Sequence, residues 1–255
     1  MRIFLDVGNT RLKWALEDAQ GGVAEAGSID YKKDAWQNES HIDVSVAIDS
    51  AWASSVASAD VRASIEQWIK KQFKRSVNWL SVTEQMCGVK NAYNDLAQLG
   101  VDRWAAVLGA KQYLQNSNCA DRAAIVVDAG TAVTVDVLDA SSVFSGGVIL
   151  PGLSMMHDSL VGRTAGINSS LVGRGAVIGK NTQACVNAGV HCALYGAVER
   201  VVFEIKEELG VSQAVLLLTG GDAQLVAQNS KLPFTVLPNL VTDGLRYAVN
   251  LGEFK

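Results

Sequence analysis

Cysteine and histidine are scarce in this chain, and neither is arranged as a metal or disulfide framework. The 255 residues include 3 histidines and 4 cysteines, and the cysteines are scattered without a Cys-x-x-Cys pair. This spacing argues against structural zinc and against disulfides. Cys185 and Cys192 lie in one apolar, helix-like stretch, where we expect both to be buried as small hydrophobic side chains.

Concentrated positive charge is also missing. The formal net charge is −4 with a pI near 5.4, and the densest basic cluster is Lys70-Lys71 with Lys74-Arg75. Such a cluster fits the solvated face of a helix, so the chain lacks the basic surface typical of nucleic-acid-binding proteins. A small anionic ligand remains open, because a few local hydrogen-bond donors can hold it.

Long apolar runs are absent as well. No stretch approaches the roughly 18 apolar residues needed to span a bilayer, and Met1-Arg2 lead directly into a strand pattern rather than a signal peptide. We therefore expect a cytoplasmic protein with no membrane contact. With only 3 prolines and 49% hydrophobic residues, the chain can bury a sizeable core, as one large domain or two small ones.

What the chain contains instead is a short signature that occurs twice. The first copy is Asp6-Val7-Gly8-Asn9-Thr10 and the second is Asp128-Ala129-Gly130-Thr131-Ala132. Each copy follows a short apolar run and precedes an alternating one, which predicts the tip of a β-hairpin. Backbone N–H groups and a threonine hydroxyl in such a turn can bind phosphate oxygens, and the aspartate can bind Mg²⁺ directly or through water. One copy alone fits a plain structural turn, whereas two copies favour a duplicated nucleotide-binding fold.

Hydrophobic periodicity predicts a similar α/β unit in each half of the chain. In the first half we expect strands within residues 2–16, near 22–29, near 44–48 and around 79–82, helices at about 60–74 and 100–114, and an irregular polar segment at 30–43. In the second half we expect strands at 123–127, 133–138, 143–150, 215–218 and 234–237, and helices at 182–209, after Asp222 as N-cap, and at about 240–251.

Five short motifs follow one another in a fixed order along this framework. They are Asp6-x-Gly8-Asn9-Thr10, Gly100-x-Asp102-Arg103, Asp128-x-Gly130-Thr131, Gly146-Gly147 with Pro151-Gly152, and Thr219-Gly220-Gly221. As an ordered set, over nearly the whole chain, they closely resemble the type III pantothenate kinases, members of the actin, Hsp70 and sugar-kinase superfamily. The resemblance implies a duplicated α/β, ribonuclease H-like fold, with actin-like ATPase halves at residues 1–115 and 116–255 around an ATP cleft. One departure is Asn94-Asp95-Leu96, where the family often carries a proline after its tyrosine.

The resemblance implies that the first signature is the phosphate loop for ATP. The residues implied to contact ATP there are Asp6, Val7, Gly8, Asn9, Thr10, Arg11, Leu12 and Lys13. Asp6 would also hold Mg²⁺ through water. Arg11 and Lys13 alternate with Leu12 and Trp14, which fits equally well a half-exposed strand with its charges outward.

The second signature carries different implied roles. Thr131 would bind phosphate oxygens, and Asp128 would be the ligand of the monovalent cation, K⁺ or ammonium, that the family characteristically needs. Gly220 and Gly221 resemble the family's adenosine loop, since two glycines let the backbone approach a purine or ribose closely. The same residues also fit a plain strand-to-helix turn capped by Asp222.

The implied acceptor site centres on Asp102. An aspartate there fits a carboxylate favoured by the dipole at a helix start, but the family pattern implies the general base that accepts the proton of the pantothenate hydroxyl. Tyr93, Gly100, Val101 and Arg103 would line the pantothenate site, together with Thr182 supplied by the partner of a homodimer. The helix expected at 182–209 fits either a subunit interface or an ordinary core helix.

The activity implied by the resemblance is ATP-dependent phosphorylation of pantothenate to 4′-phosphopantothenate, the first step of coenzyme A biosynthesis. One alternative is a kinase of a sugar or another small alcohol, because fold does not determine substrate. Another is a non-catalytic nucleotide-binding accessory regulator. The joint presence of Asp6, Asp102, Asp128 and Thr182 favours an enzyme, because a protein that only binds needs no general base.

Overall fold

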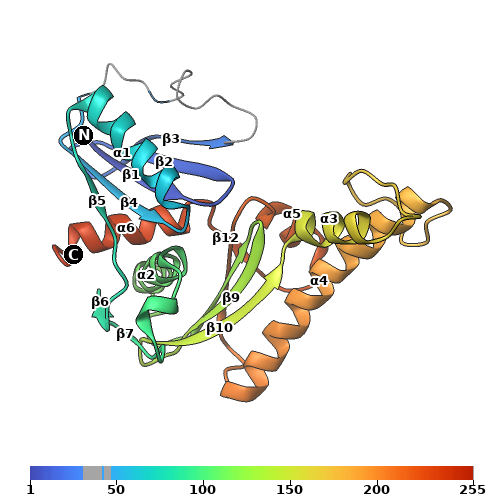
Figure 1. Cartoon of the computed structure of the whole chain (residues 1–255). Helices are drawn as coiled ribbons and strands as arrows, with labels where there is room; N and C mark the ends of the chain where they lie inside the picture. The colour runs from blue at the N-terminus through green and yellow to red at the C-terminus, as the bar shows by residue number, and fades with distance from the viewer. Residues whose placement is uncertain (31–41, 43–46, 255) are drawn as a thin grey trace. The chain divides into compact units, whose positions relative to one another are not determined.

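The computed structural model describes residues 1–30, 42 and 47–254, and the chain forms two compact units (Figure 1). The first unit contains Met1–Ala120, Ser142–Phe144 and Asn239–Lys255, and the second contains Asp121–Ser141 and Ser145–Pro238. The C-terminal segment thus packs within the first unit. The division at residues 115 and 116 follows the internal repeat instead, and it stays a prediction.

Five strands form the main sheet of the first unit in the order β3-β2-β1-β4-β5. Their bounds are β1 Arg2–Val7, β2 Arg11–Glu17, β3 Val23–Asp30, β4 Ser50–Ser55 and β5 Val77–Trp79. β1, β2 and β3 are antiparallel neighbours, whereas β4 pairs parallel with β1 and β5 pairs parallel with β4. The last pair of the β1–β2 ladder is Val7 with Leu12, so the first signature is a hairpin turn, as predicted.

The second unit contains strands in the equivalent order β10-β9-β8-β11-β12. Their bounds are β8 Ala124–Ala129, β9 Ala132–Leu138, β10 Val143–Pro151, β11 Val215–Thr219 and β12 Thr235–Val236. β8 and β9 are antiparallel and meet at the second signature, whereas β11 is parallel to β8 and to β12. The shared order of these five strands in the two sheets confirms the predicted duplicated α/β fold.

Two glycines allow close packing of helices in the first unit. Its helices are α1 Ala59–Phe73, η1 Leu96–Gln98, α2 Val101–Asn116 and α6 Leu240–Asn250, and a short hairpin of β6 Gln85–Met86 and β7 Val89–Asn91 lies between α1 and α2 in the chain. A β-carbon on Gly244 would overlap the carbonyl oxygen of Ala105, and one on Gly109 would overlap that of Leu240. Only glycine at these positions lets α2 and α6 cross so closely.

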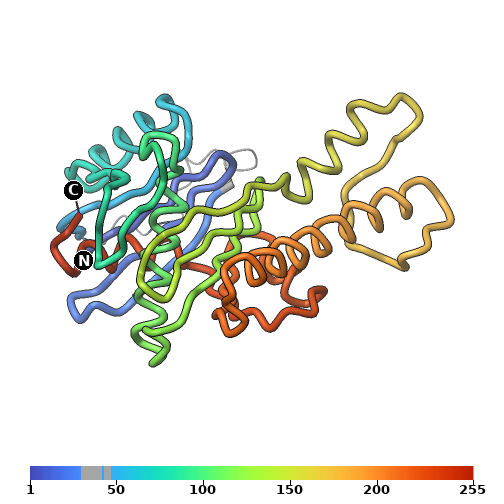
Figure 2. Tube along the Cα trace, turned by 90° about the horizontal axis from the view of Figure 1, so that it is seen from below, coloured from blue at the N-terminus to red at the C-terminus, as the bar shows by residue number. Residues whose placement is uncertain are grey.

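The helices of the second unit are α3 Leu153–Arg163, α4 Thr182–Leu209 and α5 Ala223–Asn229. The bounds of α4 match the prediction because strong signals mark both ends: the Asn181 side chain accepts the N–H of Ala184 at 2.8 Å, and Gly210 ends the helix with φ 63°. Buried Leu194 and Val198 place one side of α4 in the core. Figure 2 shows α3, in yellow-green, running beside the orange α4.

The structure corrects three expectations about local structure and burial. The strand expected near 44–48 is wrong at its described end, because Ala47 and Ile48 are not in a strand, and residues 44–46 lie outside the described part. The strand that the structure describes next is β4. Its small side chains have low β-propensity but fit between two neighbouring strands. The helix α3 was not predicted, since its apolar residues leave no clear polar face. Cys185 and Cys192 are exposed rather than buried.

The segment expected to be irregular at 30–43 lies almost entirely outside the described residues. In the part of the chain that the structure describes, no helix has both the length and the apolar character needed to cross a membrane.

Candidate active site

The first signature forms a tight turn in which the N–H of Gly8 donates to the carbonyl of Arg11 at 3.0 Å. Asn9 and Arg11 are exposed at its tip, whereas Thr10 and Lys13 are half-buried. The side chains of Val7 and Leu12 lie in the core, so these two residues could reach a ligand only through their backbone. The turn therefore places two exposed residues, one of them positively charged, at its tip, as a phosphate loop requires.

Ser54 is a further candidate site residue, which the sequence analysis did not single out. It pairs with Asp6 across the parallel strands β1 and β4, is fully buried, and donates a hydrogen bond from its hydroxyl to Asp6 Oδ1 at 3.4 Å. Both residues lie near the carboxyl ends of their strands, where α/β proteins bind ligands. The available sequence signal was the small-residue stretch Ser54-Ser55-Val56 directly before a helix.

The second signature forms an equivalent turn, with Gly130 N–H donating to the Ala132 carbonyl at 3.0 Å. Two further segments of the second unit pack against it. The N–H of Gly152 donates to the Thr131 carbonyl at 3.1 Å, and that of Asp222 donates to the Ala129 carbonyl at 2.8 Å. The second signature, the start of α3 and the loop after β11 therefore form one cluster.

Position 220 in this cluster requires glycine. Its φ is 101°, and a β-carbon on it would lie 2.5 Å from Asp128 Oδ1 and overlap the carbonyl of Ala129. Any side chain at this position would strain the backbone and displace the Asp128 carboxylate. Asp222 is the N-cap residue of α5, as predicted, although its side chain makes no capping hydrogen bond to that helix.

The start of α2 presents the carboxylate of Asp102. Gly100 is the N-cap residue, Asp102 lies in the first turn, and Asp102 Oδ1 accepts the N–H of Arg103 at 2.7 Å. Burial raises the pKa of Asp102 above the usual aspartate value of 3.8, although the hydrogen bond and charge of Arg103 act in the opposite direction. The result is a fixed carboxylate with increased basicity.

Arg103 and Tyr93 are also brought together in the first unit. Arg103 is only 6% exposed, and its Nη1 donates to Tyr93 Oη at 3.3 Å. The ring of Tyr93 is parallel to that of Phe144, with 6.1 Å between centroids. Of the predicted acceptor residues, Tyr93, Gly100, Val101, Asp102 and Arg103 thus belong to one region, whereas Thr182 is an exposed residue at the start of α4 in the second unit.

Comparison with known proteins identifies the family of the chain. A family model described as type III pantothenate kinase matches residues 2–204. The chain belongs to the type III pantothenate kinase family. The type III pantothenate kinase of Aromatoleum aromaticum is 35% identical over 254 residues, covering 96% of this chain and 96% of that protein.

Solved structures similar to this type III pantothenate kinase family member support its fold. A candidate 2-dehydro-3-deoxygalactonokinase from Sinorhizobium meliloti aligns over 98% of this chain and 99% of its own, with TM-score 0.57 and 14% identity. A candidate Baf-family transcriptional activator from Campylobacter jejuni covers 98% of each chain, with TM-score 0.56 and 18% identity. At such identities the likeness shows the fold alone, which is the duplicated α/β fold described above.

A type III pantothenate kinase uses ATP with a divalent metal ion. The described residues fit a metal ion that is bound together with the nucleotide. Among residues 1–30, 42 and 47–254, no group of three or more His, Cys, Asp or Glu side chains could form a metal centre. Mg²⁺ in kinases instead needs one or two carboxylates, water and the substrate phosphates. Asp6, half-buried beside Ser54, fits that requirement.

On the predicted role of Asp102 as general base, Gly100→Ala should lower kcat by roughly 10- to 100-fold, because a small displacement of a catalytic group has effects of this size. A β-carbon on Gly100 would lie 2.6 Å from Asp102 Oδ1, so the carboxylate must move. Steady-state kinetics measure the change. Gly173→Ala is the control, since nothing lies within 4 Å of a β-carbon there. Equal kcat in both variants would contradict the role given to Gly100.

Proposed function

We propose that this protein transfers the γ-phosphoryl group of ATP to the primary hydroxyl of pantothenate, giving 4′-phosphopantothenate and ADP at the first step of coenzyme A biosynthesis. The observation that carries the proposal is the fixed carboxylate of Asp102 next to the Arg103–Tyr93 pair, in a chain of the type III pantothenate kinase family.

Asp102 is the general base in this proposal. As the pantothenate oxygen forms its bond to the γ-phosphorus, the bond from that phosphorus to the bridging oxygen of ADP breaks, and the hydroxyl proton passes to the carboxylate. The hydrogen bond from Arg103 N–H fixes the orientation of the carboxylate. Burial, which raises the pKa of Asp102, strengthens its carboxylate as a proton acceptor.

The acceptor is bound by the residues around this base. Arg103 carries a permanent positive charge in a buried position, and pantothenate carries a carboxylate, so the two are complementary. Tyr93, Gly100 and Val101 complete the site on the same unit.

ATP is bound through both signatures. In the first unit, the backbone of residues 7–12 and the side chains of Asn9, Thr10, Arg11 and Lys13 would contact the phosphates, and Asp6 would hold Mg²⁺ through water. In the second unit, Thr131 contacts phosphate, and Gly220 with Gly221 accommodates adenosine. Bound Mg²⁺ supplies neutralisation of phosphate charge.

A monovalent cation, K⁺ or ammonium, is assigned to Asp128 in the same proposal. The carboxylate of Asp128 lies where Gly220 leaves space, close to the carbonyl of Ala129. Carboxylate and carbonyl oxygens are the ligand set that hard cations prefer. Removal of K⁺ and ammonium from the assay should therefore abolish most of the activity.

We further propose that the enzyme is a cytoplasmic homodimer in which Thr182 of each subunit contacts pantothenate in the other. An apolar groove of about 280 Å³ between α3 and α4 is lined by Met156, Leu160, Cys185 and Val190, among others, and a second copy of the chain would cover it. Thr182 begins the same helix α4. Sedimentation of the purified protein as a monomer at all concentrations would reject the dimer.

A coupled assay that records ADP release tests the activity. Purified protein with ATP, Mg²⁺, K⁺ and pantothenate should turn over, and mass spectrometry should find 4′-phosphopantothenate. Absence of turnover with either monovalent cation rejects the proposal. A panel of sugars and small alcohols serves as the comparison, because preferred turnover of one of these would identify a kinase with a different acceptor.

A further inference from the structure

Asn91 is a buried polar residue to which the proposed function gives no role. It is the last residue of β7 and only 8% exposed. Its Nδ2 donates to the carbonyl of Thr83 at 3.2 Å, and its Oδ1 accepts the N–H of Tyr93 at 3.0 Å. One side chain thus joins the segment before the β6–β7 hairpin to the segment that leaves it.

The bond to Tyr93 sets the direction in which the chain leaves β7. An asparagine oxygen that accepts the N–H two residues further on closes a tight turn. The backbone of Asn91 is itself held, because its N–H donates to the Glu84 carbonyl at 2.8 Å. The position of Tyr93 is therefore determined by a side chain that is anchored at both ends.

The same strand fixes the surface on which the Tyr93 ring lies. Asn91 is paired with Phe144 in the β7–β10 ladder, and the N–H of Ala92 donates to the Phe144 carbonyl at 3.0 Å. The ring of Phe144 is fully buried, and the ring of Tyr93 stacks on it with an interplanar angle of 4°. Aromatic pairs at such separations favour one relative orientation.

We propose that Asn91 is a positioning residue for the acceptor site, which holds Tyr93 so that its hydroxyl meets the Arg103 guanidinium. This inference rests on the proposed function, in which Tyr93 and Arg103 bind pantothenate. The contacts form a sequence from Thr83 through Asn91 and Tyr93 to Arg103. Loss of Asn91 therefore weakens the binding of pantothenate and leaves the binding of ATP unchanged.

Kinetics of three variants test the positioning role. Asn91→Ala should raise the KM for pantothenate roughly five- to tenfold, the effect expected from losing one buried hydrogen bond at a binding residue, while the KM for ATP stays within about twofold. Asn91→Asp keeps the oxygen that accepts the Tyr93 N–H, so it should recover most of the loss. If Asn91→Ala does not fold, Asn91→Ser gives the same comparison, because its side chain is too short to span both backbone groups.

Asn78→Ala is the matched control. Asn78 donates from Nδ2 to the carbonyl of Ala51 at 3.0 Å in the same unit, and this bond has no connection to Tyr93. Its loss should leave the KM for pantothenate unchanged.

A double-mutant comparison separates positioning from a general structural role. In a Tyr93→Phe background, which lacks the hydroxyl that meets Arg103, Asn91→Ala should raise the KM for pantothenate less than about twofold further. The inference is overturned if Asn91→Ala raises the KM for pantothenate by the same factor in both backgrounds. It is also overturned if the KM for ATP rises equally, or if Asn78→Ala has the same effect as Asn91→Ala. Absence of wild-type turnover with pantothenate rejects the proposed function and this inference together, whereas wild-type turnover with an unchanged KM in Asn91→Ala rejects the inference alone.

Discussion

Asp102→Asn should lower kcat by about 10²- to 10⁴-fold, the usual contribution of a general base, while the Kd for ATP stays near the wild-type value. Asparagine preserves the shape and can still accept the N–H of Arg103, which Asp102 Oδ1 now accepts at 2.7 Å. It cannot take the proton of the attacking hydroxyl. Steady-state kinetics and calorimetric titration of a non-hydrolysable ATP analogue measure the two quantities.

A measurement of thermal stability is the test that the Asp102→Asn protein is still folded. Since burial raises the pKa of Asp102 in the folded state, the folded protein binds more protons than the unfolded chain between pH 3.8 and the raised pKa. Stability therefore falls as the pH rises through this window, and above it the ionised carboxylate is unfavourable. The variant should consequently melt at the same or a higher temperature than wild type at neutral pH, and its advantage should shrink as the pH falls.

Asp95→Asn is the control for loss of charge in the same region. Asp95 is exposed, and its Oδ1 caps η1 by accepting the N–H of Ala97 at 3.0 Å. Its replacement should leave kcat within about twofold of wild type. If Asp102→Asn also retains near-normal kcat, Asp102 is not the base.

The two copies of the signature share a turn but differ in their neighbours. Gly8 and Gly130 close their turns with equivalent backbone hydrogen bonds, and Ser54 and Thr219 occupy equivalent buried positions opposite the two aspartates. The Ser54 hydroxyl donates to Asp6, whereas the Thr219 hydroxyl donates to the carbonyl of Pro238. The environments of the two carboxylates have therefore diverged, consistent with the different cations proposed for Asp6 and Asp128.

Local signals in the sequence were enough to predict the fold, but not the contacts that surround the candidate site residues. The two hairpins and α4 were predicted because their turns, caps and apolar periodicity are encoded by neighbouring residues. The Ser54–Asp6 contact depends instead on the parallel pairing of distant strands, which no local pattern shows. Gly220 likewise has its meaning only beside Asp128. The role of Asp102 was suggested by family resemblance, since an aspartate in the first turn of a helix is common.

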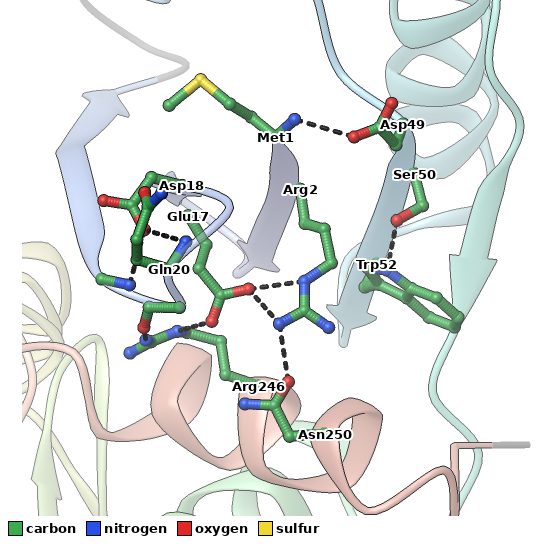
Figure 3. Close-up of polar contacts among 12 residues, drawn as sticks. Met1, Arg2, Glu17, Asp18, Gln20, Asp49, Ser50, Trp52, Arg246 and Asn250 are labelled. Carbon is green, nitrogen blue, oxygen red and sulfur yellow. Dashed lines mark hydrogen bonds and ion pairs between the residues drawn. The ribbon is translucent and has the colours of Figure 1, made fainter.

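Replacement of Glu17 should have a large effect on the stability of the first unit. Glu17 is the last residue of β2, at the opposite end of that strand from the first signature. Its carboxylate is fully buried between two arginines (Figure 3). Oε2 accepts from Arg2 Nε at 2.5 Å, and Oε1 accepts from Arg246 Nε at 3.1 Å. Arg2 and Arg246 come from β1 and α6, and Arg2 also donates to Asn250 at 2.6 Å. This cluster therefore attaches the C-terminal helix to the sheet of the first unit.

Glu17→Gln should lower the free energy of unfolding of the first unit by about 3 kcal/mol. Removal of one partner from a buried ion pair leaves the other charge uncompensated and costs about 3–5 kcal/mol of stability. We expect the lower end of this range because the side chains of Arg2 and Arg246 are partly exposed, at 30% and 17%. Urea unfolding measures the change, with a probe for each unit because two units need not unfold together.

Asp49→Asn is the matched control for Glu17→Gln, since Asp49 pairs with the N-terminal amine at 2.9 Å but is 79% exposed. Exposed pairs of this kind contribute little, so the urea midpoint of this variant should stay close to that of wild type. Equal shifts in the two variants would show that burial of Glu17 has no special consequence. Because Glu17 contacts no proposed substrate residue in these hydrogen bonds, the kcat of Glu17→Gln below its melting temperature should remain near wild type, in contrast to that of Asp102→Asn.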